Sequence, residues 1–203
     1  ITTKLWIQDA GYESTLKAFD ASLKKLGLDY LDLYLIHQPF GDYYGAWRAM
    51  EKLQKDGLIR AIGVCNFSPD RLIDLCMNSE TTPAVNQIEI HPFYQQNDAL
   101  QIMDEFGVKP QAWGPLSEGQ KNIFHNKLLK SIAAKHERTV AQVILRWHMQ
   151  RGVIIIPKTV HKERMVENMN IWDFELTEPE MQSISTMDIG HSEIFDHHCW
   201  CTA

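Results

Sequence analysis

Stretches typical of strands and stretches typical of helices alternate six times along this chain, with short connections. The strand-like stretches are short apolar runs such as residues 30–37, and the helical ones place apolar residues three or four positions apart. This order predicts parallel strands joined by crossover helices. No G-x-G spacing occurs in the sequence, so the glycine fingerprint of the doubly wound dinucleotide-binding fold is absent and a barrel is favoured.

The expected strands lie at residues 1–7, 30–37, 60–66, 84–90, 109–113 and 153–156. Helices are expected at residues 12–27, 43–55, 69–77, 98–106, 127–136, 139–150 and 178–187, with a further helix beginning near residue 162. A closed (β/α)8 TIM barrel has eight strands and typically about 250 residues, so this chain is expected to hold about six of them. We interpret residues 1–188 as barrel, with its first two strands expected upstream, and residues 189–203 as an irregular tail.

Composition narrows the classes of function. The chain is 44% hydrophobic and 23% charged, which indicates one globular domain with a sizeable core. The net charge of −6 argues against general nucleic-acid binding, and no run is long enough to span a membrane. Its four cysteines show neither the spacing of zinc ligands nor a disulfide framework, so we expect the protein to reside in the reducing cytoplasm. Four possible metal ligands gather near the end of the sequence: His197, His198, Cys199 and Cys201. We do not expect them to form a specific metal site.

The stretch GVIIIPKTVHKERMVEN, residues 152–168, is a candidate anion site. Its β-branched run from Val153 to Ile156 predicts a strand buried on both faces. A basic turn and a helix follow, with Lys158, Thr159, Lys162 and Arg164 at their junction and Met165, Val166 and Met169 as the apolar helix positions. Free backbone N–H groups, the helix dipole and fixed cations together favour a phosphate there. The alternative is a solvated helix start with ordinary surface lysines.

Several chemically versatile side chains come at the ends of the expected strands, where the active sites of such barrels lie. They are Lys4, Trp6, His37, Cys65, Asn66, Gln87, Trp113, Lys158 and Thr159. Asn66 and Gln87 can hold a carboxamide by complementary hydrogen bonds, and Trp113 offers a face for a flat ring. Lys4 and His37 can orient and polarise a reacting oxygen. Each also has an ordinary structural explanation, so their shared position is what points to a site.

Five segments together resemble the aldo-keto reductase family in motif, order and spacing: LDYLDLYLIHQP, IRAIGVCNF, AVNQIEIHP, WGPL and IPKTVHKERMVEN. The resemblance extends to about Asp188, and within the family it is similar to the bacterial type related to diketogluconate reductases. It implies a (β/α)8 barrel that binds NADPH in extended form and reduces aldehydes or ketones.

The resemblance also implies a role for each matching residue. Lys4 and His37 match the catalytic lysine and histidine, and Trp6 matches a wall of the substrate pocket. The cofactor-binding positions are Cys65, Asn66, Gln87, Trp113, Gly114, Leu116, Lys158, Thr159, Arg164, Glu167 and Asn168, of which the last five grip the adenosine 2′-phosphate or lie near the adenine. Cys65 stands where the family usually has serine, so one weaker hydrogen bond is expected there.

Two family residues find no match: the tyrosine that donates the proton and the aspartate that pairs with the lysine, both of which the family places before TKLW. The resemblance therefore leaves two functions, an NADPH-dependent reductase and a catalytically inert NADPH-binding or regulatory module; an inert structural role is the third class. We expect the 203 residues alone to show no measurable carbonyl reduction. The expected substrate is a small carbonyl compound, and the expected state is a cytoplasmic monomer.

Overall fold

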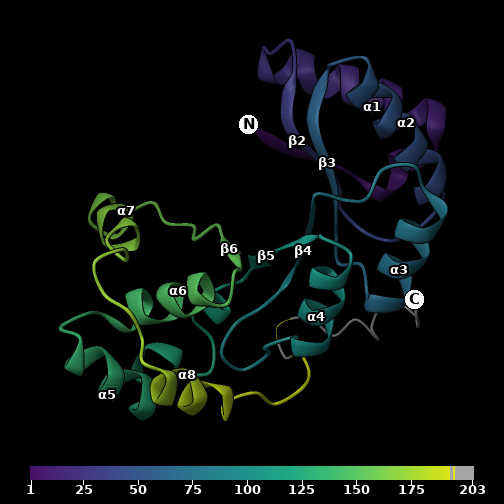
Figure 1. Ribbon diagram of the computed structural model, residues 1–203. Coiled ribbons are helices and arrows are strands. Elements are labelled where there is room, and N and C mark those ends of the chain that lie inside the picture. The colour runs from purple at the N-terminus through teal and green to yellow at the C-terminus, as the bar shows by residue number, and fades with distance from the viewer. Residues whose placement is uncertain (193, 195–203) are drawn as a thin grey trace. The chain divides into compact units, whose positions relative to one another are not determined.

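The computed structural model describes residues 1–192 and 194, and these fall into two compact units. The first unit comprises Ile1–Ile88 and Asp98–Pro110, and the second comprises Glu89–Asn97 and the described residues from Gln111 onward. The divisions fall within two strands, β4 and β5. The strands (Figure 1) are β1 Thr2–Leu5, β2 Leu31–Ile36, β3 Ile59–Cys65, β4 Val85–Glu89, β5 Lys109–Trp113 and β6 Ile154–Ile155.

The helices follow the strands as the sequence predicts. They are α1 Tyr12–Leu26, α2 Tyr43–Lys55, α3 Pro69–Asn78, α4 Asn97–Glu105, α5 Lys127–Lys135, α6 Val140–Gln150, α7 Lys162–Met169 and α8 Glu178–Ser185, with short 3-10 turns at Ile7–Asp9, Ser117–Gly119 and Ile123–His125. The strand order is β1-β2-β3-β4-β5-β6, and the pairings β1–β2, β2–β3, β3–β4 and β5–β6 are parallel. The predicted six parallel strands are therefore confirmed.

The core of the first unit lies between its sheet and the helices α1 and α2, which pack beside each other (Figure 1). Phe19 of α1 is fully buried edge-on against Tyr34 of β2, with ring centroids 5.6 Å apart. Gly63 allows β3 to approach β4 closely, because a Cβ at this position would lie 2.6 Å from the Val85 carbonyl oxygen. The two strands pair in the register Val64 with Asn86 and Cys65 with Gln87.

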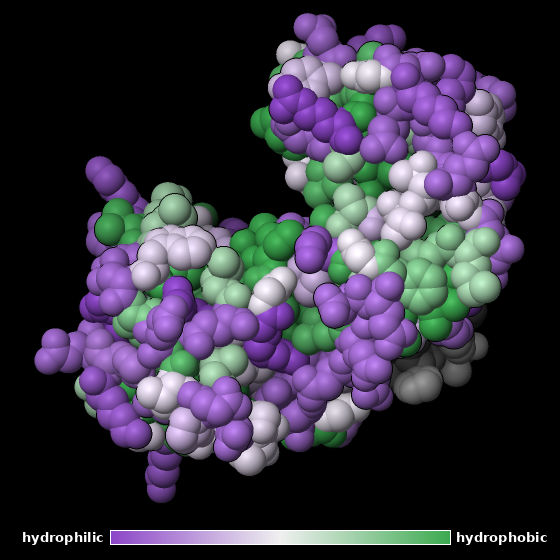
Figure 2. All heavy atoms as spheres, viewed as in Figure 1, coloured by the Kyte–Doolittle hydropathy of each residue, from purple (hydrophilic) through white to green (hydrophobic). Residues whose placement is uncertain are grey.

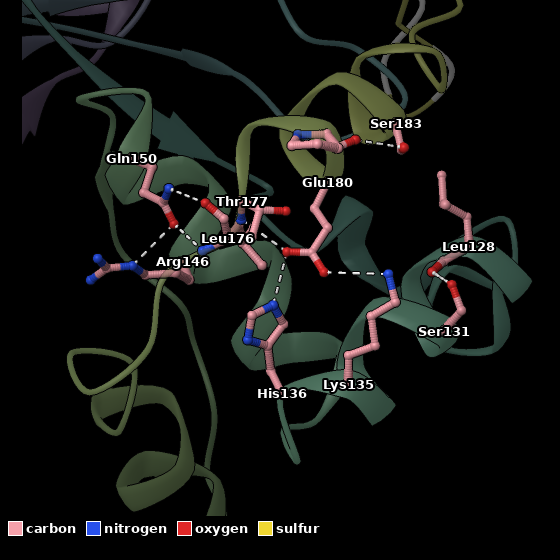
Figure 3. Close-up of polar contacts among 11 residues, drawn as sticks. Leu128, Ser131, Lys135, His136, Arg146, Gln150, Leu176, Thr177, Glu180 and Ser183 are labelled. Carbon is pink, nitrogen blue, oxygen red and sulfur yellow. Dashed lines mark hydrogen bonds and ion pairs between the residues drawn. The ribbon is translucent and has the colours of Figure 1, made fainter.

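In the second unit, polar contacts join α8 to the end of α5, and the segment just before α8 to α6 (Figure 3). Glu180 accepts hydrogen bonds from the Thr177 backbone N–H and from His136 Nε2, each 2.9 Å long. Gln150 exchanges two hydrogen bonds with the backbone of Leu176, at 2.8 and 2.9 Å. These contacts hold α5, α6 and α8 together within the second unit.

The predicted two-sided burial of residues 153–156 is wrong. Val153 is 1% exposed, but Ile154 is 40% and Ile156 is 48% exposed, and the strand is only two residues long. In the described part of the chain β6 pairs only with β5, and its apolar side chains face cavities instead of packed neighbours. No residue of α7 is buried either, and Figure 2 shows apolar surface in the region of β6 and α7.

Candidate active site

Six of the predicted site residues lie at the carboxyl ends of neighbouring strands in the first unit. Lys4 lies in β1, Trp6 and His37 follow β1 and β2, Cys65 ends β3, Asn66 follows it and Gln87 lies in β4. The strand register brings them level, because Lys4 pairs with Leu35 two residues before His37, and Cys65 pairs directly with Gln87. These six side chains therefore lie at one edge of the sheet, which is called the rim below. The sequence predicts that they come together at this edge.

Asn66, which follows β3, forms hydrogen bonds to the ends of the two neighbouring strands at this rim. Its Nδ2 donates to the His37 carbonyl at 3.2 Å, and its backbone N–H donates to the Gln87 carbonyl at 3.0 Å. The φ angle of 60° places Asn66 in the left-handed region, which asparagine tolerates better than most residues. Trp6 lies edge-on to His37, with ring centroids 5.0 Å apart. Three strand ends are therefore linked through one side chain and its backbone.

The electrostatics of the rim favour a neutral imidazole and an unreactive thiol. Burial, together with the positive charge of Lys4, lowers the pKa of His37. Burial raises the pKa of Cys65 to about 12, and its Sγ lies 3.8 Å from Gln87 Oε1, to which it donates. Among residues 1–192 and 194, Lys4 Nζ has neither a hydrogen-bond partner nor an ion-pair partner. Its charge is therefore free to stabilise an anion beside the rim.

Seven further predicted residues line one cavity of about 710 Å³ in the second unit. They are Gly114, Leu116, Lys158, Thr159, Arg164, Glu167 and Asn168. Trp113, predicted to stack on the cofactor ring, ends β5 but does not line this cavity. The stretch from residue 152 to residue 168 thus supplies one wall of the cavity, and the WGPL turn supplies another.

The charge of the cavity wall favours an anion. Lys158 and Arg164 are exposed, and neither has an ion-pair or hydrogen-bond partner in the described part of the chain. Thr159 lies next to Lys158, with its Oγ1 accepting from the His161 N–H at 3.1 Å just before α7 begins. Two unpaired cations beside a hydroxyl and a helix start are suited to a phosphate group.

The start of α6 contributes a further part of the cavity wall through Thr139, Val140 and Ala141. Thr139 caps α6, and Gln142 completes a capping box with it. Thr139 Oγ1 donates a hydrogen bond to Glu167 Oε1 at 2.6 Å. Gln142 Nε2 also donates to the Glu167 carbonyl at 3.2 Å. The orientation of the Glu167 carboxylate is therefore set from α6, although Glu167 itself belongs to α7.

Sequence reasoning missed nine residues that line this cavity: Pro115, Glu118, Gly119, Phe124, Thr139, Val140, Ala141, Ile156 and Pro157. The T-x-x-Q pattern that begins at Thr139 signals a helix cap and could have drawn attention to that residue. Pro115, Ile156 and Pro157 lie inside the WGPL and 152–168 stretches, but no role was predicted for them individually. The other five have no spacing that marks them, because the fold brings together segments that are distant in sequence.

No group of three or more His, Cys, Asp or Glu side chains in residues 1–192 and 194 is arranged to hold a metal ion. The cluster of His197, His198, Cys199 and Cys201 lies outside the described residues. No helix in the described part of the chain is both long enough and apolar enough to cross a membrane.

The chain matches known proteins over most of its length. The model of the "Aldo/keto reductase family" matches residues 1–189. Glyoxal reductase of Bacillus subtilis (strain 168) is 49% identical over 189 residues, which are 93% of this chain and 68% of that protein. Methylglyoxal reductase of Escherichia coli (strain K12) is 42% identical over 193 residues, which are 94% of this chain and 70% of that protein.

Solved structures of aldo-keto reductases match the fold. An enzyme from a Medee basin deep-sea metagenome library matches with a TM-score of 0.92 and 40% identity, over 95% of this chain and 72% of that one. The Bombyx mori aldo-keto reductase, solved in complex with NADP, matches with a TM-score of 0.93 and 34% identity, over 99% and 71% of the two chains. The predicted (β/α)8 barrel class, with six strands in this chain, is confirmed. This chain belongs to the aldo/keto reductase family.

Proposed function

We propose that this protein binds NADPH and uses it to reduce aldehydes or ketones to alcohols. One observation carries the cofactor assignment: Lys158 and Arg164 stand unpaired, beside Thr159, at a cavity of about 710 Å³ in the described residues. NADPH differs from NADH by a 2′-phosphate, and such a pair of cations favours that group. The NADP complex of the Bombyx mori relative supports the same assignment.

The remaining cavity residues would hold the rest of the adenosine half. We assign Glu167 and Asn168 to the adenine, and Gly114 and Leu116 to the turn along which the cofactor lies. The bond from Thr139 to Glu167 supports this role, because it leaves the carboxylate in one fixed orientation. In the first unit, Asn66 and Gln87 would hold the nicotinamide carboxamide, and Cys65 would act through its bond to Gln87. Trp113 would stack on the nicotinamide ring.

Bound NADPH supplies the hydride, and the residues of this chain bind and orient the carbonyl that receives it. His37, kept neutral by its lowered pKa, would donate a hydrogen bond to the carbonyl oxygen. Lys4 would favour the ionised form of a neighbouring proton donor, because a phenol near pKa 10 is a weak acid unless a cation stabilises its phenolate. Trp6 would form a wall of the substrate pocket.

The second candidate is an NADPH-binding or regulatory module without turnover. The cavity with Lys158 and Arg164 fits this candidate equally, because it concerns binding alone. Binding of NADPH is common to both candidates, so only turnover separates them. We further propose residues 1–188 as the barrel body, with residues 189–203 as a tail, acting as a monomer in the cytoplasm on a small carbonyl compound.

The test has two stages. NADPH and NADH are first titrated against the protein, with Arg164→Ala as the cavity variant and Lys162→Ala as a control, since Lys162 is also a cation of α7 but does not line the cavity. NADPH absorbance is then followed with glyoxal, methylglyoxal and 4-nitrobenzaldehyde. Binding with turnover of roughly 1 s⁻¹ or faster supports the reductase, as for ordinary enzymes. Binding without turnover supports the module, and no NADPH binding overturns both.

A further inference from the structure

His148 is a fully buried histidine that the proposed chemistry does not use. It lies in α6 with 0% exposure, and its ring packs edge-on to Trp147 with centroids 4.7 Å apart. Its Nε2 lies 3.2 Å from the Pro115 carbonyl oxygen. A carbonyl oxygen only accepts, so Nε2 carries the proton and donates it in this bond. Nδ1 is buried and has no hydrogen-bond partner in the described part of the chain.

The bond from His148 holds a loop that lines the cofactor cavity. Gly114, Pro115, Leu116, Glu118 and Gly119 all contribute to the cavity wall. Backbone bonds within the loop satisfy the carbonyls on either side of Pro115, since the Gly114 carbonyl accepts from the Ser117 N–H at 2.7 Å and the Leu116 carbonyl from the Gly119 N–H at 3.0 Å. The Pro115 carbonyl instead accepts from α6, so this bond joins the loop to a helix.

The loop needs such support. Ser117 and Glu118 both have φ of 50°, in the left-handed region that L-residues other than glycine adopt at a cost. Two such residues in succession are stable only when surrounding contacts hold them. Val140 and Ala141 of the same helix, and its cap residue Thr139, also line the cavity, so α6 supports both this part of the wall and the loop.

The unpartnered Nδ1 indicates that His148 contributes more than filling space. An apolar side chain of similar size would fill the site without burying an unsatisfied nitrogen, which is unfavourable. What the histidine adds is the N–H that reaches Pro115. Burial lowers the pKa of His148 to about 3, so the ring stays neutral and the donor is retained at ordinary pH.

We propose that His148 is a positioning residue for cofactor binding, which holds the loop from Gly114 to Gly119 in its binding conformation through the Pro115 carbonyl. The cofactor part of this proposal rests on the proposed function, whereas the effect on the loop does not. His148 touches no part of the cavity directly, since it does not line it. It would act by keeping the wall in place before the ligand arrives, which lowers the ordering that binding requires.

The test compares three variants in the full chain. His148→Leu keeps an apolar side chain and removes the donor, and His148→Gln keeps a terminal N–H donor. Val143→Ala is the matched control, because Val143 is equally buried in α6 but does not line the cavity and makes no bond to the loop. Backbone amide exchange of residues 114–126 is measured without ligand, and the NADPH dissociation constant is measured by titration.

Loss of one neutral hydrogen bond predicts that exchange in this segment and the NADPH dissociation constant both rise about 2- to 12-fold in His148→Leu. His148→Gln should return both quantities toward the wild-type values, and Val143→Ala should leave them unchanged relative to other segments. Unchanged exchange in His148→Leu, an equal rise in Val143→Ala, or no recovery in His148→Gln would each overturn the proposal. A wild-type protein that does not bind NADPH would overturn the proposed function instead, while the exchange result still decides the role of His148 in the loop.

Discussion

Acidification should destabilise the protein through His148, and the size of the effect follows from its burial. The ring is fully buried and neutral in the folded protein, with a pKa of about 3 instead of 6.5. Burial is the main cause, and electrostatic interactions with Arg151 and His91 also lower the pKa of His148. In the unfolded chain the same ring titrates near its ordinary pKa, so between these two values the unfolded state binds the additional proton.

The sign and magnitude follow directly. A group whose pKa is depressed on folding contributes stability that is complete above the unfolded pKa and is lost as the pH falls toward the folded pKa. The slope is about 1.4 kcal/mol per pH unit inside this window. Integrated from pH 7 to pH 5, His148 alone should lower the free energy of unfolding by about 2 kcal/mol.

Urea unfolding followed by tryptophan fluorescence at pH 7, 6 and 5 measures this loss. His148→Leu lacks the titrating ring, so its free energy of unfolding should fall by about 2 kcal/mol less than that of the wild type over the same range. Any contribution from His37, whose pKa is also lowered, is present in both proteins and cancels in the difference. Equal losses in wild type and variant would refute the account of His148 as a neutral buried ring.

Three further changes have defined outcomes. Arg164→Ala should weaken NADPH binding about 10- to 100-fold in a fluorescence titration and leave NADH binding nearly unchanged; equal losses would remove the 2′-phosphate assignment. Lys4→Met in an active enzyme should lower kcat far more than it raises the NADPH dissociation constant, because Lys4 would act mainly in the transition state. A large binding defect with intact turnover would instead make Lys4 a cofactor ligand. Thr139→Val removes the cap of α6 and the bond to Glu167. It should lower the free energy of unfolding, measured in urea, by about 1 to 2 kcal/mol. A change below about 0.5 kcal/mol would mean that the cap contributes little.

Regular elements could be predicted closely where periodicity and stop signals agree. The helix Tyr43–Lys55 and the strand Lys109–Trp113 match their predicted bounds at both ends. The apolar positions of α2 recur at helical spacing and Gly57 follows its end, with φ of 79° that glycine adopts readily. Because parallel strands end at one edge of a sheet, the alternation also predicted which residues come at strand ends.

Burial and long-range contacts could not be read from the pattern. An apolar run such as Val153–Ile156 has the same composition whether it packs in a core or lines a cavity, and here Ile154 and Ile156 are exposed. Ser117 and Glu118 adopt left-handed backbone angles although neither is a glycine, so their residue types do not signal this conformation. The bond from His148 to Pro115 joins residues 33 positions apart, so only the folded chain reveals it.

Hydrogen exchange with and without saturating NADPH tests the central claim most directly, because it reports where the cofactor contacts the chain. The account predicts slower amide exchange at residues 114–119 and 158–168 of the second unit, and at residues 65–67 after β3 in the first. NADH at the same concentration should protect residues 158–168 much less, since it lacks the 2′-phosphate that Lys158 and Arg164 would bind. Unchanged exchange at residues 158–168 with NADPH bound, or equal protection by both cofactors, would contradict the assignment of this cavity to NADPH.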